Sequence, residues 1–352
     1  MTIKVGLIGF GLSGRFFHGP FIQNDAEMAL TCVCTRQEQA VQETHPQARV
    51  VSGVDEVMTA QDVDLVVITT PNSLHFEQAK QALENGKHVL LEKPSVTTVE
   101  QIEELCTLSK QKGLVFCVYQ NRRFDGDFQH LKALIESKEL GELKQLESRF
   151  DRFRPQLQDR WGEQPGVGAG IFWNLGPHLF DQILLLLGTP DWLQASIDIL
   201  RDGGQTADTF ELELGYGEKR IRLGYSTFEA GEASRFNARF THGRWQCFGV
   251  DPQEEALRSG QIPGQAVFPS AGRAQSMTHH KSADQLTVES KEDIAPIGQY
   301  VDFYQQLRDA ILHQGEPPVS LVHASQLVYG LCLAEESAAK NQRLTWDYQP
   351  NI

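Results

Sequence analysis

The sequence predicts two domains, an N-terminal α/β domain of the Rossmann type and an α+β domain with a large, mostly antiparallel sheet. In the first 120 residues, short apolar runs alternate with helix-length segments, the arrangement of a doubly wound, mostly parallel sheet. After residue 122, apolar and polar side chains alternate, as in a sheet with one solvated face. With 352 residues, 40% of them hydrophobic, the chain can bury two cores. We divide it into residues 1–121 and 122–352.

Each expected strand of the first domain is an apolar run followed by a helical pattern. The segment "NSLHFEQAKQALENGK" places His75, Ala79 and Leu83 at helical spacing and reaches a C-cap signal at Asn85 and Gly86. We expect strands within residues 3–11, 30–36, 63–71, 87–94 and 113–120.

The second domain opens with a predicted helix within residues 127–141. Segments with a period of two residues then indicate strands. The Gly- and Pro-rich stretch 261–272 is typical of a surface loop, and later segments have helical periodicity. The last helix is a candidate to pack back on the first domain. The strands are expected at 210–216, 221–227 and 235–240, and the helices at 299–313 and 321–340.

Composition excludes several classes of partner. A net charge of -14 argues against a nucleic-acid binder, which needs clustered Lys and Arg. We see no signal peptide and no apolar run near the roughly 20 residues of a membrane span. The six cysteines are scattered, which favours reduced thiols in a cytoplasmic protein. His279 and His280 are expected in a loop, without companion ligands, so no metal site is predicted.

A glycine-rich loop follows the first strand in the spacing of a dinucleotide fingerprint. Gly9 would permit a tight turn, Gly11 a close approach of the pyrophosphate, and Gly14 close packing of helix on strand. The loop lies between an apolar strand and a crossover unit, which is the context that the motif requires. The predicted coenzyme contacts here are Gly9, Phe10, Gly11, Leu12, Ser13 and Gly14.

The end of the second strand indicates which dinucleotide binds. An NAD site usually has an acid there for the ribose hydroxyls, whereas Arg suits a 2′-phosphate. This chain has Thr35 and Arg36, a hydroxyl donor and a guanidinium that can pair with phosphate in a bidentate manner. We expect NADP, with NAD as the weaker alternative. The competing interpretation is that Arg36 is a solvated loop residue.

Several segments together resemble the glucose-fructose oxidoreductase, inositol dehydrogenase and rhizopine-catabolism family (Gfo/Idh/MocA). They occur in the family's order and spacing and cover the whole chain. Within the family, "YQNRRFD", "RFDRFRP" and "GVDPQEEALRSG" are most similar to NADP-dependent scyllo-inositol 2-dehydrogenases. The other matching segments are "GLIGFG", "TTPNSLHFEQAKQALENGKHVLLEKP" and "NLGPHLFDQ".

The resemblance implies two catalytic residues, Lys93 from "EKP" and His178. Alcohol oxidation needs a base and a positive charge near the developing alkoxide, tasks that suit histidine and lysine. We place His178 at the start of a helix, just after Pro177, where helix N–H groups and the Lys93 ammonium disfavour imidazolium. The bond before Pro94 is typically cis in the family. Without the resemblance, His178 would be taken as a helix-cap residue.

Further site residues are also implied by the resemblance. Where the family usually has Asp, four residues before the histidine, this chain has Asn174, which brings no charge. The arginines have a structural alternative, pairing with acids such as Asp125. The implied substrate contacts are Asn121, Arg122, Asp151, Arg154 and Asn174, and the implied additional coenzyme contacts are Thr70, Pro71, Asn72, His75, Glu92, Lys93 and Asn121.

The expected function is hydride transfer between NADP and a ring hydroxyl of a cyclitol or sugar, of the scyllo-inositol and inosose type. An aldose or ketosugar reductase and a non-catalytic NADP-binding sensor are the alternatives, since fold alone does not fix function. Lys93 and His178 favour the enzyme, whereas Asn174 is also compatible with the sensor interpretation. The family implies a homodimer or larger assembly. From the strand pattern we expect one face of the second sheet on the helices and the other against a partner subunit, and a solvent-facing sheet would give a similar pattern.

Overall fold

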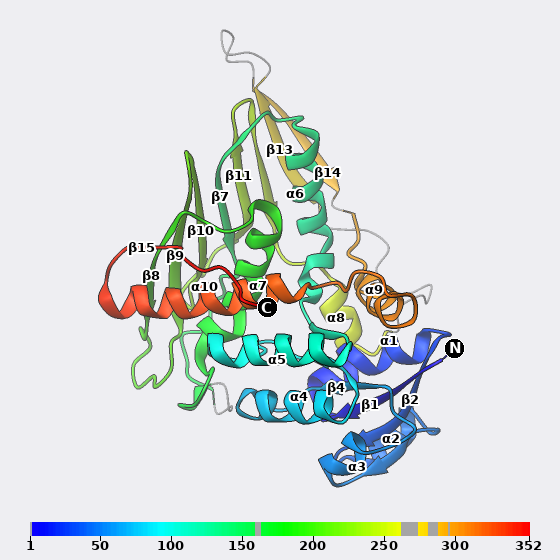
Figure 1. The fold of residues 1–352 in the computed structure, drawn as a ribbon. Coiled ribbons are helices and arrows are strands. Elements are labelled where there is room, and N and C mark those ends of the chain that lie inside the picture. Colours follow the sequence, from blue (N-terminus) through cyan, green and yellow to red (C-terminus); the bar gives the residue numbers. More distant parts are fainter. Residues whose placement is uncertain (1, 159–162, 262–273, 281–287, 295) are drawn as a thin grey trace.

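The computed structural model describes residues 2–158, 163–261, 274–280, 288–294 and 296–352. Two sheets organise these residues, and Figure 1 shows them at opposite ends of the molecule with helices between. The first is a six-stranded sheet in the order β3-β2-β1-β4-β5-β6, with every neighbouring pair parallel. This is the predicted doubly wound sheet.

The strands of the first sheet are apolar because helices cover both of its faces. Strand β4 (Leu65–Ile68), for example, is buried throughout. The five predicted strands are confirmed, and β3 is an edge strand of three residues that the apolar pattern does not reveal. The remaining strands are β1 (Ile3–Ile8), β2 (Met28–Cys34), β3 (Arg49–Val51), β5 (His88–Leu91) and β6 (Phe116–Val118).

Helices follow the strands as crossovers. The predicted helix α4 (His75–Glu84) ends where expected, with Gly86 at a φ of 76°, a conformation that favours glycine. A π-helical turn, η1 (Gly14–His18), precedes α1 (Gly19–Asn24) after the glycine loop. The others are α2 (Glu38–Thr44), α3 (Val54–Met58), the 3₁₀ turn η2 (Asn72–Leu74) and α5 (Val99–Lys112).

The second sheet has nine strands among the described residues, in the order β14-β13-β12-β11-β7-β10-β9-β8-β15. Strands β7 (Leu143–Arg149) and β10 (Lys219–Tyr225) pair in parallel, and the other neighbours are antiparallel, as predicted. The remaining strands are β8 (Trp192–Asp198), β9 (Thr209–Tyr216), β11 (Ser234–Phe240), β12 (Gly243–Phe248), β13 (Ala274–His280), β14 (Val288–Ile294) and β15 (Leu344–Thr345).

Two sequence interpretations concern this sheet. The expected loop position of His279 and His280 is wrong, because both belong to β13, which pairs with β14 in a hairpin. Polar residues can form such a hairpin strand through backbone bonds alone, so the apolar pattern gave no signal. Residues 262–272, expected as a surface loop, lie outside the described residues.

The long helix α7 (Gly170–Leu187) packs on β9 and β10 and covers the inner face of the second sheet there. The last helix, α10 (Leu321–Lys340), contacts α7 and β8 in the second domain and α5 in the first. Figure 1 shows α10 lying between the two halves, directly above α5. The other elements are the 3₁₀ turn η3 (Asn121–Phe124), α6 (Gly126–Ser137), α8 (Gln253–Arg258) and α9 (Tyr300–His313).

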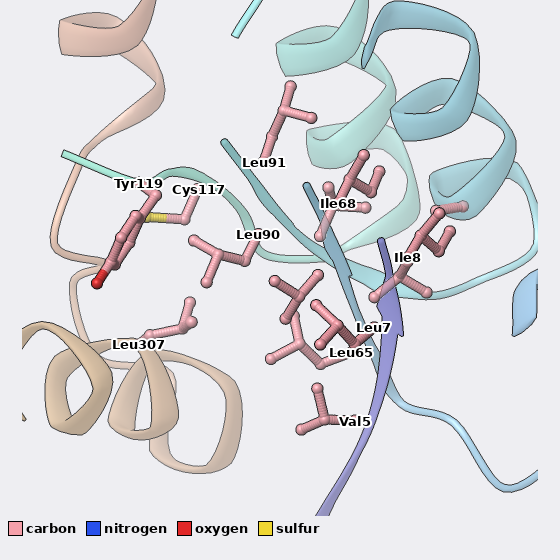
Figure 2. Packing of buried hydrophobic residues seen from close by; sticks show 14 of the residues in the cluster. Val5, Leu7, Ile8, Leu65, Ile68, Leu90, Leu91, Cys117, Tyr119 and Leu307 are labelled. Atoms are coloured by element: carbon pink, nitrogen blue, oxygen red, sulfur yellow. The ribbon is translucent and has the colours of Figure 1, made fainter. Parts of the chain in front are cut away.

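The core of the first domain takes in residues from the end of the chain. Tyr300, Phe303 and Leu307 of α9 and Val328 of α10 belong to the same buried cluster as β1, β4 and β5. Figure 2 shows Leu307 reaching up toward Leu90 and Tyr119. In the described part of the chain, no helix is long and apolar enough to cross a membrane.

Candidate active site

The glycine loop after β1 has the geometry expected of a phosphate-binding turn. Gly9 has a φ of 95°, and a Cβ there would lie 2.6 Å from the Thr69 hydroxyl. At Gly14 a Cβ would lie 2.3 Å from the Gly9 carbonyl oxygen, so both positions need glycine. At Gly11 nothing lies within 4 Å of the Cβ position, which leaves open space over the loop. The loop therefore fits a pyrophosphate.

Arg36 lies at the carboxyl end of β2 with an exposed side chain. It forms no ion pair with any residue that the structure describes. The neighbouring Thr35 Oγ1 accepts a hydrogen bond from the Gln37 N–H at 3.1 Å. The guanidinium is thus free to bind a phosphate that lies outside the sheet edge.

Glu92 follows β5 directly and contacts the glycine loop. Its carboxylate accepts hydrogen bonds from the Ser13 hydroxyl and from the Lys93 N–H, the latter at 2.9 Å, and its Oε1 lies 3.1 Å from His18 Nε2. Burial alone would raise the pKa of Glu92, but His18, Lys93 and Ser13 lower it to about 2. Through His18, whose Nδ1 contacts Tyr304 at 2.5 Å, the carboxylate is also connected to α9.

Lys93 reaches from the first domain to helix α7 of the second. The Lys93–Pro94 bond is cis, as the resemblance implies, and Lys93 Nζ donates to the Asn174 carbonyl at 2.9 Å and to its Oδ1 at 3.0 Å. Burial is the main cause that lowers the pKa of Lys93, and Glu92 acts in the opposite direction. The ammonium therefore lies where the carboxyl end of β5 meets helix α7 of the second domain.

His178 lies one helical turn after Asn174 on α7, so the two share a face. The predicted place at the start of a helix is wrong, because α7 begins at Gly170 and Pro177 lies inside it. The pKa of His178 is nevertheless well below its usual value, through burial first and then the charge of Lys93. Arg122 and Arg235 act in the same direction.

Neither ring nitrogen of His178 has a hydrogen-bond partner among the described residues, and Nδ1 is fully enclosed. Buried polar atoms in proteins nearly always have partners. An uncharged, unbonded imidazole beside an ammonium is suited to exchange a proton with a bound molecule.

The structure places the predicted substrate contacts in different situations. Arg122 is buried and pairs with Asp125 Oδ2 at 3.1 Å and with Glu254, so the predicted pairing with Asp125 occurs. Both oxygens of Asp151 are held within the protein, by Arg149 and by the Ser226 N–H.

The remaining predicted contacts separate into exposed and enclosed residues. Asn174 is exposed, whereas Asn121, at the start of η3, and Arg154 are partly buried. His75 is enclosed, and its ring nitrogens contact the Pro94 and Thr70 carbonyls, each at 2.8 Å.

Further polar residues at the end of β4 bond within the protein. The Thr70 hydroxyl donates to Gln78 Oε1 at 2.6 Å, and Pro71 caps η2. Asn72 Nδ2 donates to the Gly168 carbonyl at 3.0 Å. These contacts hold the loop after β4 and join it to the segment before α7.

Sequence reasoning missed Glu254, Arg152 and His18. Glu254 comes from α8 and pairs with Arg122, and Arg152 lies between two residues that were singled out. His18 lies just beyond the glycine loop and contacts Glu92. A histidine beside Phe16 and Phe17, just after the glycine loop, was the available signal for His18. No group of three or more potential metal ligands gathers among the residues that the structure describes.

Comparison with protein-family models gives two matches. Residues 3–120 match the oxidoreductase family with an NAD-binding Rossmann fold, and residues 128–246 match the C-terminal domain of the GFO/IDH/MocA proteins. The chain belongs to the Gfo/Idh/MocA family. It is therefore an NAD(P)-dependent oxidoreductase built on the family's two domains.

Relatives within the Gfo/Idh/MocA family match over almost the whole chain. The uncharacterized oxidoreductase YdgJ of Escherichia coli (strain K12) is 39% identical over 96% of each chain. The NADP⁺-dependent scyllo-inositol 2-dehydrogenase IolW of Bacillus subtilis (strain 168) is 31% identical over 99% of this chain and 97% of its own. The solved structure of the oxidoreductase yvaA from Bacillus subtilis superimposes with a TM-score of 0.94 at 30% identity, covering 98% of this chain and 99% of that one.

Proposed function

We propose that this protein transfers a hydride reversibly between NADP and a ring hydroxyl of a cyclitol or sugar. The carrying observation is the position of Lys93 Nζ, which is bonded to Asn174 one helical turn from the unpartnered His178. The relative IolW, whose name states NADP⁺-dependent scyllo-inositol oxidation, supports a cyclitol substrate. Aldoses and ketosugars present the same secondary alcohol chemistry and belong in the same test.

Lys93, His178 and Asn174 have different roles in the proposed reaction. When bound, NADP accepts or returns the hydride. The Lys93 ammonium donates a hydrogen bond to the reacting oxygen and stabilises the negative charge that develops there. His178 takes up the hydroxyl proton, and we assign this to Nε2 because Nδ1 is enclosed. Asn174 holds Lys93 through neutral oxygens. This contact therefore does not neutralise the positive charge that the ammonium presents to the substrate.

Coenzyme binding would use the open glycine loop and the exposed Arg36. Gly11 offers free space for the pyrophosphate, and η1 follows directly after this loop. Arg36 and Thr35 would receive the 2′-phosphate of NADP.

We also propose a homodimer or larger assembly in the cytoplasm. The face of the second sheet that α7 does not cover carries Glu147, Glu213, Arg222 and Arg239 around one cavity, charges of both signs that a second copy could pair with. No disulfide joins the cysteines in the described part of the chain, which fits a reducing compartment. A monomer in sedimentation equilibrium at micromolar concentration would contradict the assembly.

The function is tested by an absorbance screen at 340 nm with purified protein. Inositols and sugars are offered with NADP⁺, inososes and ketosugars with NADPH, and each reaction is repeated with NAD⁺ or NADH. We expect turnover of at least one cyclitol or sugar with NADP(H). Tight NADP binding without turnover of any of them would favour the sensor.

Arg36→Ser should change the coenzyme preference. Loss of the guanidinium removes the charged partner of the 2′-phosphate, so KM for NADP⁺ should rise about tenfold or more while KM for NAD⁺ stays within about threefold. Initial-rate kinetics with both coenzymes measure this. Arg343→Ser, an exposed arginine that stacks on Trp192 far from the glycine loop, is the control. Equal changes for both coenzymes would show that Arg36 does not contact the 2′-phosphate.

Asn174→Asp should shift the pH dependence of oxidation. A carboxylate bonded to Lys93 and one turn from His178 favours the charged form of the imidazole, so it raises the pKa of His178. Because the base must be neutral, the acid limb of kcat/KM should move to higher pH, by about one pH unit or more. Profiles from pH 4.5 to 9 measure this, with Asn351→Asp as a remote control. If the acid limb of the kcat/KM profile does not move, His178 is not the group that takes up the proton.

A further inference from the structure

The segment that follows β7 pairs with the residues that follow β10. The Arg152 N–H donates to the Ser226 carbonyl at 3.0 Å and the Arg154 N–H to the Thr227 carbonyl at 2.8 Å, and Phe153 forms an isolated bridge with Phe228. In an extended segment, alternate side chains share a side. Arg152 and Arg154 therefore face one way, while Phe153 faces the other.

Arg152 and Arg154 differ from the neighbouring arginines Arg122 and Arg149 in having no acidic partner among the described residues. Arg122 pairs with Asp125 and Glu254, and Arg149 pairs with Asp151. Across the described residues, neither Arg152 nor Arg154 makes a side-chain hydrogen bond or ion pair. Both are partly buried.

The charge environment of Arg152 is unfavourable without a ligand. Burial is the main cause that lowers its pKa, and the neighbouring charge of Arg154 adds to it. Glu254 opposes this shift, but its carboxylate already pairs with Arg122. A partly buried guanidinium without a partner carries an uncompensated desolvation cost. An anion placed between the two arginines would remove that cost.

The contacts of Arg122 link the segment of Arg152 to helix α7. The Arg122 guanidinium lies 5.0 Å from the centroid of the Phe150 ring, two residues before Arg152. The Arg122 carbonyl accepts a hydrogen bond from Gln182 Nε2 at 2.7 Å, one helical turn after His178.

The Glu254 carboxylate is influenced by both Arg152 and Lys93. Arg122 in turn acts on Arg152, Lys93 and His178. An anion on Arg152 would thus belong to a molecule that also reaches the Lys93 ammonium.

We propose that the natural substrate carries a negatively charged group, a carboxylate or a phosphate, which Arg152 binds with the help of Arg154. Arg152 then determines specificity, and Lys93 and His178 act on a hydroxyl elsewhere in the same molecule. A guanidinium binds either anion in a bidentate manner, so Arg152 could bind a carboxylate and a phosphate through the same interaction. This inference rests on the proposed hydride transfer and narrows its substrate class to sugar acids or phosphorylated sugars and cyclitols.

The test compares each neutral substrate with its charged counterparts at fixed NADP(H). Suitable sets are glucose, glucuronate and glucose 6-phosphate, and myo-inositol with myo-inositol 1-phosphate. We expect kcat/KM to be at least tenfold higher for one charged class than for its neutral counterpart, and the class that responds distinguishes carboxylate from phosphate. In Arg152→Gln this preference should fall about tenfold or more, mainly through KM. Arg152→Lys should retain part of it, and Arg343→Gln all of it.

Two results would overturn the inference and leave the proposed function intact. One is equal or better turnover of the neutral compounds by the wild-type protein. The other is a charge preference that persists in Arg152→Gln. If no compound is turned over, the proposed function fails, and calorimetric titration of the NADP-bound protein with glucuronate and glucose 6-phosphate decides the anion site separately. Binding that Arg152→Gln abolishes would support the site, and absence of binding would overturn it.

Discussion

His178→Asn is expected to lower kcat for alcohol oxidation by about 10²–10⁴-fold, the range for loss of a general base. Asparagine keeps polar atoms on α7 but cannot accept the proton. The wild-type pKa of His178 lies well below its usual value, so the neutral base persists as pH falls from 7 toward 6. The wild-type rate should therefore decline only at lower pH. This decline on the acid side of the pH profile should be absent in His178→Asn.

Steady-state kinetics across pH measure both effects, and fluorescence titration with NADPH checks that coenzyme binding is kept. His313→Asn, at the exposed end of α9, is the matched control. Wild-type turnover by His178→Asn, with NADPH bound normally, would remove His178 from the mechanism.

Lys93→Met is expected to lower kcat by about 10²–10³-fold at saturating coenzyme and substrate, because the developing alkoxide loses its charged donor. Methionine keeps much of the side-chain length, so it fills most of the volume that the lysine side chain occupies. The same substitution leaves Asn174 Oδ1 without its bond to Nζ. Circular dichroism and thermal unfolding should verify that the variant is folded.

Lys80→Met is the control for Lys93→Met, since Lys80 lies on the outside of α4 and pairs with Glu104. If Lys93→Met retains kcat within threefold of the wild type, the reacting oxygen does not depend on the ammonium. Hydride transfer would then need another source of charge stabilisation, for which Arg122, whose charge also acts on Lys93, is a candidate.

The fold was largely predictable because its signals are local. Strands such as β4 are buried on both faces and read as continuous apolar runs, and β9 alternates as a strand with one buried face must. Strand β3 has three residues, too few for a pattern to form. The hairpin of β13 and β14 depends on backbone pairing that polar sequences do not reveal.

Site residues were predictable where a short sequence motif identifies them, whereas the contacts between distant residues were not. Lys93 follows from the end of a strand, but its bond to Asn174 joins residues 81 positions apart. Glu254 meets Arg122 across 132 positions, and no local pattern encodes such a contact. Pro177 suggested a helix start, since proline favours the first turn. The surrounding helix is buried, and this packing keeps it intact through the proline.

The core in Figure 2, in which Leu307 packs beside Leu90 and Tyr119, has a consequence for chimeric proteins. The core of the coenzyme half is built from separated stretches of the chain: the first domain, Leu257 of α8, and the helices α9 and α10. A graft of residues 1–121 from a relative would therefore meet a foreign α9 and α10, and its buried surface would not match. Exchange of coenzyme preference between relatives is better sought by changing single residues at the end of β2 than by swapping domains.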